Sequence, residues 1–216
     1  MDKTVIHVAL VSRGAAAALA AGTQPAGPGA AARRSQLARV VLHALLSGVT
    51  GRDDWVVRTA ASGKPYLLDD GPAISLSHSG EMIAAAVDLA GRPLGIDLEC
   101  HKPRDFHAIA AQWFGPHERA AVARTGMAAF YRIWTAREAR AKALGTGLAG
   151  ALRAGNTVGA RSGDGWISGG FWFFHDRPVP GYSLTIATQG EAPRAVAYMS
   201  VDTKDDVTTA PRRGGR

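Results

Sequence analysis

The sequence YRIWTAREARAKALGTGL, residues 131–148, is the stretch that decides the fold. Ala, Arg, Glu, Lys and Leu dominate it, and all of them are good helix formers, so we predict a single helix. Glu138 and Lys142 are four residues apart and therefore lie on one face of that helix. Taken alone, such a pair indicates only a surface ion pair.

Both ends of this helix have sequence features of their own. Thr135 and Glu138 have the spacing of a capping box, which marks a helix start. Gly145 and Gly147 supply the helix stop. We therefore expect a turn capped by Thr135 and a helix that ends at the glycines.

Upstream, residues 93–100 predict a strand in which apolar residues alternate with Asp97 and Glu99. The two carboxylates share one face and lie about 7 Å apart along the chain. They could simply meet water on an exposed face. Two carboxylates on one face are also how a protein holds Mg²⁺, and Glu138 is the candidate for a third ligand from the distant helix.

The rest of the chain reads as a mixture of short strands and helices. Expected strands occupy residues 4–11, 55–59, 73–79, 82–89, 167–174, 182–188 and 195–201, and expected helices occupy 33–47, 106–112 and 116–124. The aromatic residues near 171–174 lack interleaved Lys and Arg, so we expect them to be core rather than a base-stacking platform. The fold class is therefore α/β (α+β).

Composition limits the function classes. The chain has 216 residues, a net charge of +7 and one cysteine, Cys100. The lone cysteine excludes an internal disulfide and fits a reducing, cytoplasmic compartment, and no apolar run is long enough to span a membrane. The positive charge indicates an acidic partner, although part of it lies in a tail, residues 203–216, that we expect to be disordered.

A run of small polar residues near Ser77 and His78 can present hydroxyls, an imidazole and backbone N–H groups to a ligand. A serine hydrolase is disfavoured, because adjacent strand residues point to opposite faces and no Gly-x-Ser-x-Gly elbow is present. Arg33 and Arg34 stand at the start of a helix, where they are either solvated or placed to meet an anion.

Five motifs in register resemble the 4′-phosphopantetheinyl transferases, and more narrowly the long, surfactin-synthetase-activating type. The resemblance covers roughly residues 30–200. The motifs are Gly63-Lys64-Pro65, Ser77-His78-Ser79, Gly95-Ile96-Asp97-Leu98-Glu99, Trp134-Thr135-Ala136-Arg137-Glu138-Ala139-Arg140-Ala141-Lys142 and Gly145-Thr146-Gly147-Leu148.

The resemblance implies a fold of two similar α/β halves related by a pseudo-twofold axis, in a monomer with pseudo-dimer architecture. We place the first half at residues 1–105, the second at 106–202 and the basic tail at 203–216. The implied reaction transfers the phosphopantetheine arm of coenzyme A to a serine of an apo carrier protein and releases adenosine 3′,5′-bisphosphate.

The resemblance also implies roles for individual residues. Asp97, Glu99 and Glu138 would hold Mg²⁺, and oxygen ligands suit Mn²⁺ as well. Lys142 would bind a diphosphate oxygen, and Glu138 would take the serine proton directly or through water. The implied coenzyme A ligands are Arg34, Ser35, Lys64, Ser77, His78 and Lys142.

The net charge indicates the kind of partner, and the arginine at position 137 leaves alternative functions open. Carrier proteins of this class are acidic, and a basic enzyme would attract them; the carrier could be of the acyl, polyketide or peptidyl kind. The family usually has lysine where this chain has Arg137, which leaves open a catalytically impaired homologue. A nucleic-acid-binding module is a remote alternative, because Lys and Arg are scattered while the carboxylates cluster.

Overall fold

The computed structural model describes residues 4–20, 29–68, 71–153 and 155–200. It contains both sheets and helices, which confirms the mixed α+β class. The chain divides into two compact units. The first consists of Met1–Ala60, Pro65–Arg92 and Pro193–Arg216, and the second of Ala61–Lys64 and Pro93–Ala192.

The first unit is built on a four-stranded sheet with the order β11-β1-β5-β4. Strands β1, β5 and β4 are antiparallel neighbours, whereas β11 pairs with β1 in parallel. The elements of this unit are β1 Val5–Ser12, α1 Arg13–Leu19, α2 Ala30–Thr50, β2 Val57–Thr59, β3 Pro65–Leu67, β4 Ala73–Ser79, β5 Met82–Asp88 and β11 Ala195–Met199.

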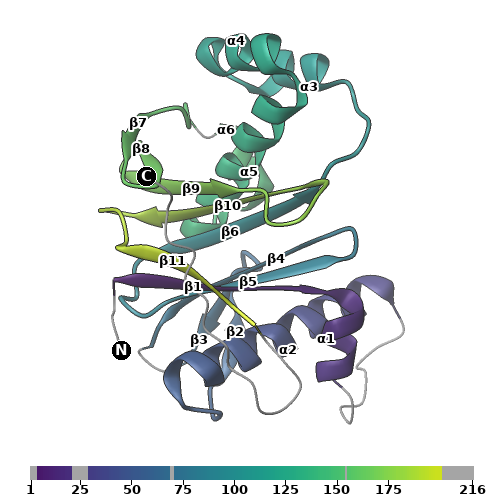
Figure 1. The fold of residues 1–216 in the computed structure, drawn as a ribbon, viewed down its shortest axis with the longest axis vertical. Helices are drawn as coiled ribbons and strands as arrows, with labels where there is room; N and C mark the ends of the chain where they lie inside the picture. The colour runs from purple at the N-terminus through teal and green to yellow at the C-terminus, as the bar shows by residue number, and fades with distance from the viewer. Residues whose placement is uncertain (1–3, 21–28, 69–70, 154, 201–216) are drawn as a thin grey trace. The chain divides into compact units, whose positions relative to one another are not determined.

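Helix α2 covers one face of this sheet (Figure 1). Val41, Leu45 and Val49 recur every four residues, so they form one buried stripe. They pack in one core with Ile83 and Val87 of β5, which explains why the apolar pattern of this stretch predicts its helix.

The second unit is built on a five-stranded antiparallel sheet with the order β6-β10-β9-β8-β7. Its long helix α5 lies on one face of the sheet (Figure 1). The elements are β6 Leu94–Cys100, α3 Phe106–Trp113, α4 Pro116–Thr125, α5 Met127–Leu144, α6 Gly147–Arg153, β7 Ala160–Ser162, β8 Gly165–Ser168, β9 Phe171–Asp176 and β10 Tyr182–Gln189.

Helix α5 approaches the sheet closely because the facing residues are small. Ala136, Ala139 and Ala143 are buried in one cluster with Phe171 and Phe173 of β9, so these aromatic residues are core, as expected. At Gly95 of β6 an added Cβ would lie 1.8 Å from the carbonyl oxygen of Ala139. Only glycine permits this contact between helix and strand.

The ends of α5 differ in part from the prediction. The helix begins earlier, at Met127 after Gly126. Thr135 is not a cap: it lies within the helix, and its hydroxyl donates to the carbonyl of Tyr131 four residues back. The helix does end before Gly145, which adopts the left-handed conformation with φ of 70°. Gly147 is not a second stop but the first residue of α6.

The division of the chain also differs from the expected boundaries at residues 105 and 202. Strand β6 belongs to the second unit because it pairs with β10. Strand β11 belongs to the first unit because it pairs with β1. The predicted tail, 203–216, lies outside the described residues. Within the described part of the chain, no helix has the length and apolarity needed to cross a membrane.

Candidate active site

Strand β6 holds the two predicted carboxylates against α5. Asp97 is opposite Thr185 of β10, and Glu99 is opposite Ser183. Gly95, Asp97 and Glu99 share a face because strand side chains alternate, and the close contact at Gly95 shows that α5 covers this face. Asp97 is therefore buried, with 4% of its surface exposed, rather than half in water.

Helix α5 supplies the third carboxylate, that of Glu138, and the positively charged side chain of Lys142. The Nζ atom of Lys142 donates to Oδ1 of Asp97 at 2.7 Å. Burial raises the pKa of Glu138 to about 7, and the negative charges of Asp97 and Glu99 add to the rise, while Lys142 opposes it. The structure thus brings Asp97, Glu99, Glu138 and Lys142 into one electrostatic group.

This group suits a divalent cation in kind. Its donors are carboxylate oxygens, which Mg²⁺ prefers. The raised pKa of Glu138 reflects burial first and then the nearby negative charge, which a cation would neutralise. Among the described residues, however, no three His, Cys, Asp or Glu side chains lie close enough together to hold a metal ion as they stand. The metal ligands Asp97, Glu99 and Glu138 therefore stay a prediction.

A chain of buried polar groups lies under α5 beside Asp97. The hydroxyls of Thr135 and Thr185 are 2.6 Å apart, and Nδ1 of His175 is 3.0 Å from that of Thr185. Thr135 gives its proton to the carbonyl of Tyr131, so it accepts from Thr185, and Thr185 in turn accepts from His175. The proton of the neutral imidazole is therefore on Nδ1. The sequence patterns did not indicate these hydrogen bonds among Thr135, Thr185 and His175.

Lys64, predicted to bind coenzyme A, contacts the end of α5. Its Nζ atom donates to the carbonyl of Ala143, and burial lowers the pKa of the amine. Carbonyls in the last turn of a helix carry partial negative charge, so the contact also stabilises α5. A role in coenzyme A binding stays a prediction.

The other predicted coenzyme A ligands lie in the first unit. Arg34 and Ser35 are near the start of α2. The N-cap residue of this helix is Gly29, which has no side chain to cap it. Ser77 is buried and His78 is exposed on β4, in keeping with the expectation that the two side chains point to opposite faces. The binding roles of these four residues are not tested by their positions.

Sequence reasoning missed one buried ion pair next to the site. Arg137 of α5 donates to Oε2 of Glu118 on α4 at 2.5 Å, and both side chains are almost fully buried. The residues are 19 positions apart, and nothing in their local sequence indicates the pairing. Arg137 thus has a defined structural partner.

Part of the sequence is similar to known proteins. Residues 93–187, which include β6, α5 and most of β10, match the family model of the 4′-phosphopantetheinyl transferase superfamily. The 4′-phosphopantetheinyl transferase HetI of Nostoc sp. is 34% identical over 128 residues, covering 54% of this chain and 54% of that protein. These matches show that about half of the chain is similar in sequence to 4′-phosphopantetheinyl transferases.

Two Bacillus proteins give similar results. The 4′-phosphopantetheinyl transferase psf-1 of Bacillus pumilus is 33% identical over 125 residues, covering 54% of this chain and 52% of the relative. The 4′-phosphopantetheinyl transferase of Bacillus subtilis is 37% identical over 95 residues, covering 40% and 39%. The chain thus spans about half the length, or less, of the curated relatives it matches.

Proposed function

We propose that this protein transfers the 4′-phosphopantetheine moiety of coenzyme A to a serine hydroxyl of an apo carrier protein, as a transferase of the long, surfactin-synthetase-activating type. The observation that carries the proposal is the group formed by Asp97 and Glu99 on β6 with Glu138 and Lys142 on α5. The superfamily match over residues 93–187 contains the whole group.

The residues of this group suit the steps of such a transfer. Attack on a diphosphate needs positioning and charge neutralisation more than covalent help. Asp97, Glu99 and Glu138 would hold Mg²⁺, which supplies positive charge for the diphosphate. Lys142 would release Asp97 and bind a diphosphate oxygen. Glu138 would accept the serine proton, directly or through water.

The remaining assignments extend the proposal. Arg34, Ser35, Lys64, Ser77 and His78 would contact the nucleotide end of coenzyme A. The acceptor would be an acidic acyl, polyketide or peptidyl carrier protein, attracted by the positive charge of the chain. The enzyme would act as a cytoplasmic monomer.

Mass spectrometry tests the proposal. An apo carrier protein incubated with the enzyme, coenzyme A and Mg²⁺ should gain the phosphopantetheine mass, and the gain should disappear in Asp97→Ala and Glu138→Ala. Asp164→Ala is the control, because this exposed carboxylate lies in the turn between β7 and β8. No gain with several carriers would point to an impaired homologue, and full transfer by Asp97→Ala would refute the proposed metal ligands.

A further inference from the structure

The ion pair between Arg137 and Glu118 is deeply buried. Arg137 is 4% exposed and Glu118 is fully buried. Burying two charges is costly unless each has close, well-aligned partners. Arg137 also directly precedes Glu138, so whatever fixes its side chain acts on the helix at the position of the proposed general base.

The guanidinium of Arg137 contacts two helices besides its own. Its Nη2 atom donates to Glu118 of α4, and its Nη1 atom donates to the carbonyls of Ala151 and Leu152 at 3.4 and 3.3 Å. These carbonyls belong to the last turn of α6, where helix carbonyls lack intrahelical partners. A single side chain therefore joins α4 and α6 to α5.

Glu118 is held as firmly from its other side. Its Oε1 atom accepts from both the amide and the hydroxyl of Thr157, and its Oε2 atom also accepts from the amide of Gly115. Burial alone would raise the pKa of Glu118, but the bonds from Arg137 and Thr157 outweigh it and keep the pKa below its usual value. The carboxylate is therefore a charged, fully bonded anchor for Arg137.

The contacts of Arg137 also shape the surroundings of Glu138. Glu138 and Arg137 line a narrow gap that is too small to hold a water molecule, and Trp134, Ala151 and Leu152 supply apolar surface to the same gap. The last two residues are those whose carbonyls Arg137 binds. The position of α6, and with it one wall beside Glu138, thus depends on the guanidinium.

We infer that Arg137 is a positioning residue, which fixes α6 against α5 and so keeps the apolar wall next to Glu138; its effect on turnover rests on the proposed transferase function. Arginine is needed here because its planar fork bonds a carboxylate and carbonyls at the same time. A lysine has one ammonium group and cannot span Glu118 and both carbonyls equally well.

The test compares Arg137→Lys and Glu118→Gln with the wild type. We expect amide hydrogen exchange in residues 147–157 to accelerate in both variants, while exchange in β6, β9 and β10 is unchanged. In the transfer assay kcat should fall about ten- to hundredfold, because a small displacement near the reacting groups is costly, whereas KM for coenzyme A should change less than about twofold. Combining the two substitutions should add little, since they break one interaction.

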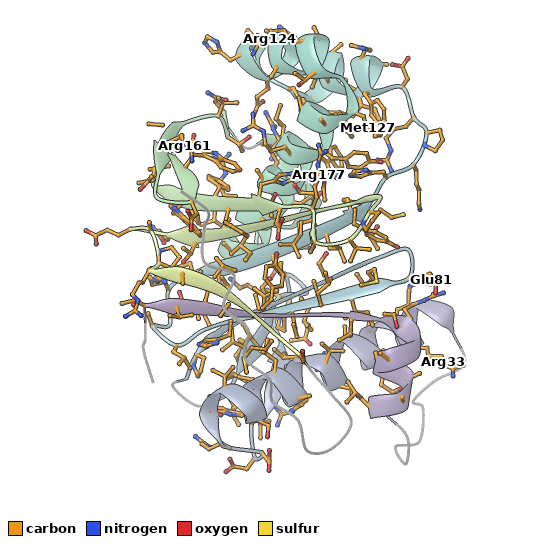
Figure 2. The ribbon with its side chains drawn as sticks, in the orientation of Figure 1. Arg33, Glu81, Arg124, Met127, Arg161 and Arg177 are labelled. Atoms are coloured by element: carbon orange, nitrogen blue, oxygen red, sulfur yellow. The ribbon has the colours of Figure 1, made fainter. Side chains whose placement is uncertain are left out.

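Arg124→Lys is the matched control. Arg124 is an exposed arginine on α4 (Figure 2), so the variant makes the same change from arginine to lysine at the surface. It should behave as wild type in both measurements. Unchanged exchange in residues 147–157 of both Arg137→Lys and Glu118→Gln would overturn the inference. Faster exchange with unchanged kcat would reject a role in turnover. A wild type without transfer activity would reject the proposed function, while the exchange data would still decide whether Arg137 holds α6.

Discussion

The negative charge of Glu138 would attract a metal ion, but it is unfavourable in the metal-free protein. Glu138 is half-buried beside Asp97 and Glu99, so its charged form is unfavourable, and its pKa rises from 4.5 to about 7. A carboxyl group with a raised pKa in the folded state contributes stability at low pH, and the contribution is lost as the pH rises from 4.5 through 7. The charge that would attract a metal therefore lowers stability when no metal is bound.

The Glu138→Gln variant tests this balance. Without metal, we expect its free energy of unfolding at pH about 8 to exceed that of the wild type by about 2 kcal/mol, after allowance for partial exposure, with no difference below pH about 4. Added Mg²⁺ should raise the unfolding temperature of the wild type but not of the variant. Calorimetry across this pH range provides the measurement. An equal response of both proteins to Mg²⁺ would contradict the assignment of Glu138 as a ligand.

His175 gives a pH dependence in the opposite direction. Burial, with the charges of Arg132 and Arg177, lowers the pKa of the imidazole to about 4. The neutral form is stable in the folded state, so the contribution of His175 is present above pH about 6.5 and is lost as the pH falls toward 4.

We expect His175→Asn to remove this acid sensitivity, because an amide nitrogen can replace Nδ1 as the donor to Thr185. Between pH about 6.5 and 4.5 the wild type should lose about 2 kcal/mol more stability than the variant. Urea unfolding at several pH values measures the difference. Parallel losses in the two proteins would show that His175 does not titrate as its surroundings indicate.

At the scale of elements, the decisive contact is that between β6 and α5 at Gly95. The strand and its alternation were predictable, as were the helix and its stop at Gly145. The sequence did not indicate which face of β6 the helix covers, since a lone glycine in a strand has several explanations. Thr135 was misread because the pattern of a capping box can also occur within a helix, where the hydroxyl bonds the preceding turn.

Gly95→Ala should therefore damage both stability and the site. The new Cβ would collide with the backbone of Ala139, so α5 must move away from β6, at a cost of about 3 kcal/mol. Gly48→Ala is the control: its Cβ would meet only the Cε atom of Met199 at 3.8 Å. An alanine within helix α2 should stabilise by about 0.5–1 kcal/mol. Chemical denaturation of both variants measures the effect, and equal stabilities would contradict the packing of α5 on β6.

At the scale of the whole molecule, the first unit is assembled from distant parts of the chain. Five residue pairs join β11 to β1 in parallel. The apolar pattern predicted the strand near residue 195, but periodicity does not identify a partner almost the whole length of the chain away. The same limit explains why the pairing of Arg137 with Glu118 was not foreseen, whereas the carboxylate group could be assembled from its motifs.

Deletion of residues 193–216 tests the role of β11. It should lower the unfolding temperature by about 10 °C, for a loss of about 3 kcal/mol, and promote self-association through the exposed edge of β1. Deletion of residues 203–216 alone is the control, because β11 stays in place. Thermal unfolding and size-exclusion chromatography measure both effects. Similar behaviour of the two truncations would show that β11 contributes little.

The parallel pairing of β1 with β11 also constrains the order of events on the ribosome. Strand β1 is synthesised before the segment from Pro93 to Ala192, whereas its neighbour β11 emerges only after that segment. That intervening segment can collapse around its own sheet first, because its strands pair with one another. Strand β1 must therefore wait, with one hydrogen-bonding edge bare, until this segment has been translated, and an assisting chaperone would be needed most during that interval.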